Sequence, residues 1–184
     1  MLALVLALLI ANSDDPGVPP TPPPADCSIV DTRGASKILG FPVGDPDEAA
    51  RAGGICFFVA RSAGDEGTLT YAIVTKDRLP VRRAFYRATA RRCAPAVKGT
   101  LNELACRQFI ALAGAQDMDA YWAARASAAD ASPVPGLGDA AIESGNALYV
   151  HRGDKVFELS VLVAGDLDLT RTTDLANQVL GQVK

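Results

Sequence analysis

A histidine, a glutamate and two serines in the last third of the chain could support nucleophilic catalysis. They are His151, Glu158, Ser144 and Ser160. A histidine beside a carboxylate and a hydroxyl is the arrangement that activates a nucleophile. However, the motif Gly-x-Ser-x-Gly, which presents the nucleophile in many hydrolases, is absent. A small secreted hydrolase using His151 is therefore the alternative hypothesis, and we assign no catalytic residue.

The four cysteines offer either disulfides or a metal site. Structural zinc sites use ligands in close pairs, but no two of these cysteines lie within a few residues of each other. The C-x-x-C motif of thiol redox sites is also absent. An even number of cysteines in an exported chain favours disulfides, and four cysteines allow three pairings. We favour the pairing of nearest neighbours, without a metal or cofactor: Cys27–Cys56 and Cys93–Cys106.

Arginines at helical spacing indicate a binding surface. Eight Lys or Arg residues and one acid lie between residues 76 and 98, although the formal net charge of the chain is −3. Arg83, Arg87 and Arg91 recur every fourth residue, which places like charges on one helix face. An anionic partner would relieve that repulsion, either an envelope protein or an anionic membrane surface. Pairing with acidic residues elsewhere in the chain would relieve it as well. We expect no nucleic-acid partner, because the chain has an export signature and a pI of about 5.1.

The first 24 residues predict an extracytoplasmic location, which could be periplasmic, secreted or membrane-tethered. Residues 1–11 are an unbroken apolar run, followed by small residues before a cleavage after Ser13. The run covers about 16 Å as a helix, against roughly 30 Å for a bilayer core. No Lys or Arg precedes Arg33, so we expect residues 1–13 to be a signal peptide or a truncated membrane anchor. Six prolines make residues 14–24 a semi-rigid tether.

Residues 25–184 are long enough for a single α+β domain with its own core. Two strand–strand–helix units predict an antiparallel sheet of two hairpins, with helices on one face and an inserted helical hairpin. The turn Gly153-Asp154 predicts the register of the second hairpin, in which Tyr149 lies opposite Glu158. Helices are expected over residues 31–39, 46–52, 80–92, 117–129 and 170–183, and a further helix is expected to begin at residue 100. Strands are expected over residues 55–61, 68–75, 140–144, 147–152 and 155–163.

Several structural motifs resemble those of bacterial exported domains of unknown function with a PsbP-like fold. They are Cys27, Leu39-Gly40, the Gly54-x-Cys56 pair, the loop at residues 136–140, and the closing hairpin with its helix. The similarity covers roughly residues 27–76 and 135–183 and leaves out the helical stretch between them. The resemblance implies a small antiparallel sheet with flanking helices, and a binding or assembly module rather than an enzyme. We therefore expect a non-enzymatic extracytoplasmic binding domain that presents a basic helix to an anionic partner.

Overall fold

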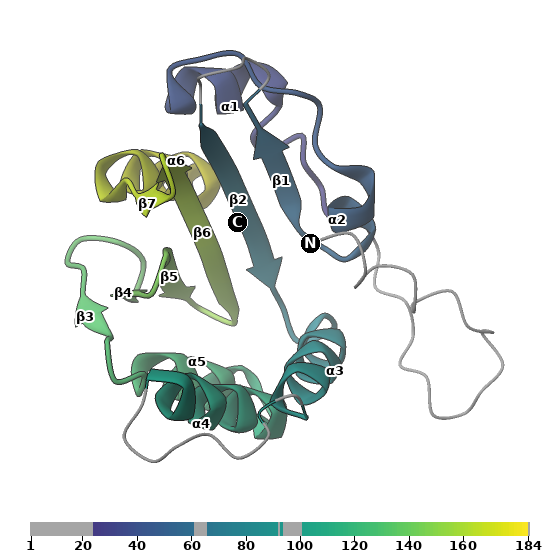
Figure 1. The fold of residues 1–184 in the computed structure, drawn as a ribbon, viewed down its shortest axis with the longest axis vertical. Helices are drawn as coiled ribbons and strands as arrows, with labels where there is room; N and C mark the ends of the chain where they lie inside the picture. The colour runs from purple at the N-terminus through teal and green to yellow at the C-terminus, as the bar shows by residue number, and fades with distance from the viewer. Residues whose placement is uncertain (1–23, 61–65, 92, 94–100, 184) are drawn as a thin grey trace, which may run out of the picture.

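One antiparallel sheet forms the centre of the protein (Figure 1). The computed structural model describes residues 24–60, 66–91, 93 and 101–183. Within these residues the sheet has seven strands, arranged in the order β1-β2-β6-β5-β4-β3, with β7 paired to β6. The predicted signal or anchor, and the tether up to residue 23, lie outside the described residues. The strands are β1 (Cys56–Val59), β2 (Gly67–Val74), β3 (Ser132–Pro133), β4 (Ala140–Ser144), β5 (Ala147–Arg152), β6 (Lys155–Val163) and β7 (Asp166–Leu167).

Helices pack against both faces of this sheet. On one face α1 and α6 cover the main core, and near one end of the other face α3, α4 and α5 enclose a second, smaller core. The predicted α+β class is confirmed, but the expectation of helices on one face only is wrong, because the inserted helices pack on the opposite face. The helices are α1 (Thr32–Leu39), α2 (Glu48–Ala52), α3 (Leu79–Ala90), α4 (Leu101–Gly114), α5 (Met118–Ala126) and α6 (Leu169–Gln182).

Side chains along β6 point alternately to the two faces of the sheet, so that they pack against different helices. Phe157, Leu159 and Val161 point into the main core, where burial of each side chain contributes roughly 1.5–3 kcal/mol. Val156 joins the second core on the opposite face, because successive strand residues point to opposite sides. Glu158 therefore points toward the inserted helices, although most of the residues in this strand are apolar.

The predicted register of the second hairpin is confirmed. Val150 lies opposite Phe157, and Tyr149 lies opposite Glu158. Gly153 adopts a φ of +59°, which a glycine reaches without strain in a two-residue turn. The two strand–strand–helix units adjoin through the antiparallel pair β2 and β6, but α3 and α6 pack on opposite faces of the sheet.

The start of α2 differs from the prediction. The helix predicted over residues 46–52 begins at Glu48, because Asp47 is its cap and the Asp47 carboxylate accepts from the Ala50 N–H at 2.7 Å. Asp45 is occupied elsewhere, since it accepts from the Thr32 hydroxyl at 3.1 Å. The helix therefore begins at Glu48, because the Asp47 carboxylate can accept from a backbone N–H group in its first turn.

Candidate functional site

A buried cluster of ionised side chains joins the sheet to the inserted helices. Glu158 of β6 accepts from the Arg82 Nη2 of α3 at 2.7 Å, and from the Arg125 Nη2 of α5 at 2.7 Å. The hydroxyl of Tyr121 donates to the same carboxylate at 2.6 Å. The three charged side chains are only 6–13% exposed. Their ion pairs therefore act in a medium of low dielectric, where breaking one is costly.

Three tyrosine rings surround the Arg125 guanidinium. Its carbon lies 4.2 Å from the ring centroid of Tyr149, 5.1 Å from that of Tyr86 and 5.7 Å from that of Tyr121. Arg125 also donates to the hydroxyls of Tyr149 and Tyr86, which fixes the plane of the guanidinium. Its Nε is buried and has no acceptor among the described residues. Cation–π contacts stabilise the buried charge without neutralising it.

The cluster carries one more positive than negative charge. Burial alone would raise the pKa of Glu158, but the charges of Arg82 and Arg125 outweigh this effect and lower that pKa to about 2. Burial raises the pKa of Tyr121 and Tyr149, so their hydroxyls stay neutral. At neutral pH two guanidinium groups thus share a single carboxylate.

An open groove of about 350 Å³ reaches this cluster. Strand side chains that the inserted helices leave uncovered, among them Thr70 and Ser160, form its floor. Phe85 of α3 and Phe109 of α4 supply apolar walls, and Phe85 is 55% exposed. The largely buried Arg82, Arg125 and Glu158 also line the groove. The groove therefore offers both excess positive charge and apolar surface to a ligand.

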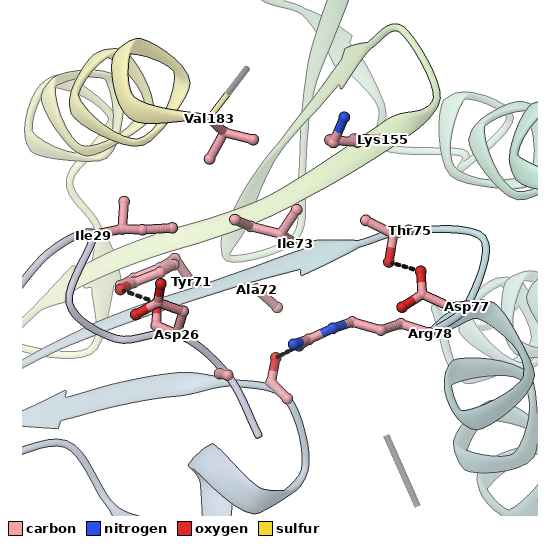
Figure 2. A pocket seen from close by; sticks show the side chains of 12 residues that line it. Asp26, Ile29, Tyr71, Ala72, Ile73, Thr75, Asp77, Arg78, Lys155 and Val183 are labelled. Atoms are coloured by element: carbon pink, nitrogen blue, oxygen red, sulfur yellow. Dashed lines mark hydrogen bonds between the residues drawn. The ribbon is translucent and has the colours of Figure 1, made fainter. Parts of the chain in front are cut away.

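A second cavity, of about 330 Å³, borders β2 on the side of the N-terminal segment (Figure 2). The Tyr71 hydroxyl accepts from the Val30 N–H and donates to the Asp26 carbonyl, both at 3.2 Å. Arg78 donates to the carbonyl of Gly54 at 3.4 Å, as Figure 2 shows, and also to that of Pro24 at 3.2 Å. Burial raises the pKa of Tyr71 to about 12. Because Tyr71 and Arg78 hydrogen-bond to the backbone of residues 24–30, they hold this N-terminal segment against the sheet.

The structure separates the three arginines predicted as a binding face. Arg83 is half-buried and its Nε donates to the Ala113 carbonyl at 3.4 Å, which joins α3 to α4. Arg87 and Arg91 are exposed, and neither forms an ion pair with any residue that the structure describes. The neighbouring Arg82, which belongs to the same basic run, instead enters the buried cluster.

The catalytic arrangement of the alternative hypothesis is not assembled among the described residues. The ring of His151 stacks on Trp122 with centroids 5.3 Å apart, and its Nε2 is buried without a partner there. Ser144 donates to an Asp130 carboxylate oxygen at 2.7 Å, and Ser160 donates to a backbone carbonyl. Neither serine hydrogen-bonds to the histidine, so the geometry contains no activated hydroxyl of this kind.

The disulfide pairing predicted from the sequence is confirmed. Cys27 bonds to Cys56 and ties the segment before α1 to β1, while Cys93 bonds to Cys106 and joins the end of α3 to α4. Within the described ranges, no group of His, Cys, Asp or Glu has the arrangement of a metal site. No helix in those ranges combines the length and apolar character needed to cross a bilayer.

Comparison of the chain with protein-family models, with curated proteins and with solved structures finds no match. The predicted resemblance to a PsbP-like fold therefore stays a prediction, and the function has to be inferred from the geometry of the site.

Sequence reasoning missed four members of the cluster: Arg82, Tyr86, Tyr121 and Arg125. Arg82 was counted only as part of a basic run, and Arg125 sits in an alanine-rich helix. One available signal was Glu158, whose neighbours on both sides in the strand, Phe157 and Leu159, are apolar, because a buried carboxylate requires a partner.

Proposed function

We propose that this chain is a non-enzymatic binding domain of an extracytoplasmic compartment, and that an anionic ligand occupies the groove beside α3. One observation carries the proposal: two arginines and only one glutamate of the buried cluster line an open groove. Excess positive charge in a poorly solvated site costs free energy unless an anion compensates it.

The unused hydrogen-bond donors of the arginines support the same conclusion. A guanidinium has five N–H donors. Within the described part of the chain, Arg82 hydrogen-bonds only through Nη2, which leaves its other N–H donors without a protein acceptor. Both oxygens of Glu158 already accept from arginine. A ligand oxyanion in the groove would supply acceptors that the protein itself lacks.

Titration with a small oxyanion tests the groove directly. Sodium acetate would be titrated at constant ionic strength, balanced with sodium chloride, while backbone amide resonances are followed by NMR. We expect saturable shifts at Thr70 and Ser160, which line the groove, and none in Arg82→Gln. The control Arg33→Gln removes an exposed charge on α1 and should keep the shifts. Absence of shifts in the groove of the wild-type protein would refute anion binding there.

The two disulfides support the extracytoplasmic part of the proposal, since such bonds form and persist in oxidising compartments. The intact mass of protein recovered from its native compartment, with and without reductant, reports both disulfide content and N-terminal processing. Four free thiols in the native protein would contradict this location.

Exposed Arg87 and Arg91 favour a second binding surface for an anionic partner. Vesicles of neutral lipid, with and without a fraction of phosphatidylglycerol, test it by co-sedimentation. We expect retention on the anionic vesicles at low salt only, and a loss in Arg87→Ala/Arg91→Ala. The matched control is Arg33→Ala/Lys37→Ala, which removes two exposed charges from α1. Equal retention of both double variants would rule out this surface as the membrane contact.

A further inference from the structure

The groove also has a shape and composition that narrow the class of ligand. We infer that the groove binds an amphipathic monocarboxylic acid, an inference that rests on the proposed anion site. The carboxylate lies against Arg82 and Arg125, and the apolar part extends past Phe85 and Phe109 over the floor formed by β2 and β6.

The charge of the cluster points to a monoanion. Two guanidinium groups and one carboxylate leave a single positive charge, which one negative charge balances. A dianion would leave excess negative charge beside Glu158. The planar fork of a guanidinium also matches a planar carboxylate, to which it can donate two parallel hydrogen bonds.

The walls of the groove point to an apolar remainder. Phe85 is 55% exposed, and the half-buried side chains of Phe109 and Ile55 also line the groove. Aromatic side chains bury large areas and so dominate the energetics of apolar contacts. A ligand that ended at its carboxylate would leave these side chains in water, whereas an attached apolar group would cover them.

The volume of the groove limits the size of the ligand. A water molecule occupies about 30 Å³ of the liquid, so the space of about 350 Å³ holds roughly a dozen waters. The ligand portion inside the groove therefore has on the order of a dozen non-hydrogen atoms. Phenylbutyrate has this size and combines an aromatic ring, a short apolar chain and one carboxylate.

Calorimetric titration with three probes tests this class: phenylbutyrate, its neutral amide and acetate. We expect phenylbutyrate to bind at least about tenfold more tightly than its amide, since a charge-assisted hydrogen bond contributes enough for such a factor. It should also bind at least about tenfold more tightly than acetate, which lacks the apolar group that covers the walls of the groove. Arg82→Gln should remove the preference for acid over amide. Thr70→Trp, which fills the floor of the groove away from the buried cluster, should abolish binding, whereas Thr68→Trp, on the same face but outside the groove, should not.

The outcomes separate this inference from the anion site on which it rests. If acetate binds as tightly as phenylbutyrate, or if a longer apolar chain on the acid adds no affinity, the groove is an anion site and the amphipathic class is wrong. If acid and amide bind equally, the arginines do not select the ligand and both proposals fail. If Thr70→Trp binds phenylbutyrate like the wild type, the ligand lies elsewhere. Folding of each variant is checked by its thermal transition, and Thr70→Trp keeps the test valid where Arg82→Gln fails to fold.

Discussion

Neutralising Glu158 should destabilise the fold at neutral pH and remove one component of its acid sensitivity. In Glu158→Gln the amide keeps an acceptor for one arginine, but two buried guanidinium groups lose their shared counter-charge. The pKa of Glu158 falls from 4.5 in the unfolded chain to about 2 in the folded protein. That shift corresponds to about 3 kcal/mol of stability at pH 7, within the range found when one partner of a buried pair is removed.

The dependence on pH identifies the carboxylate as the source. Because its pKa is depressed on folding, the stability it contributes is present above about pH 4.5 and is lost as the pH falls toward about 2. The free energies of unfolding of wild type and Glu158→Gln should therefore differ by about 3 kcal/mol at pH 7 and converge near pH 2. At neutral pH this difference corresponds to a decrease of roughly 6–12 °C in Tm.

Urea unfolding at a series of pH values measures both quantities. The matched control is Glu143→Gln on β4, which lies two strands from β6 in the same sheet. The Glu143 side chain is half-buried and forms no hydrogen bond or ion pair with a described residue. This control variant should stay within about 0.5 kcal/mol of the wild type. Stabilisation by the buried ion pairs would be refuted if the free energies of unfolding of wild type and Glu158→Gln differed by less than about 1 kcal/mol at pH 7. It would also be refuted if their difference stayed constant down to pH 2, because the ionised Glu158 carboxylate would then not be its source.

Two further predictions concern the disulfides and a glycine. Replacing Cys27 and Cys56 with serine should lower the free energy of unfolding by about 4 kcal/mol, and replacing Cys93 and Cys106 should lower it by about 3 kcal/mol. The first disulfide closes a loop of 29 residues and the second one of 13, and the larger loop restricts the unfolded chain more. Urea unfolding checks the values, and a reversed order would contradict the loop-entropy argument. Gly138→Ala should destabilise by over about 2 kcal/mol, since its Cβ would lie 2.4 Å from the His151 carbonyl oxygen, with φ at +56°. Gly136→Ala, at φ +84° with no atom within 4 Å, should cost only about 1 kcal/mol; equal thermal shifts for the two variants would refute the close contact at Gly138.

Features that depend on neighbours in the chain could be predicted from the sequence. The turn at Gly153 determined the register that places Tyr149 opposite Glu158. Asp31 and Gly40 cap α1, and each disulfide joins a cysteine to the next cysteine along the chain. The turn and the caps follow from residues close along the chain, where a local backbone conformation leaves few alternatives. The disulfides follow from the small number of possible pairings, since four cysteines allow only three.

The candidate site depends on residues that the chain brings together from far apart. Arg82 and Arg125 lie 76 and 33 residues from Glu158 in the sequence. The register predicted from the sequence places Tyr149 opposite Glu158, but it does not indicate which side chains helices cover. Only the packing of α3 and α5 on that face buries Glu158, and burial turns an ordinary carboxylate into the centre of an ion-pair cluster. The same packing leaves the adjacent part of the sheet uncovered, because these helices reach only one end of β2 and β6, and so it creates the groove.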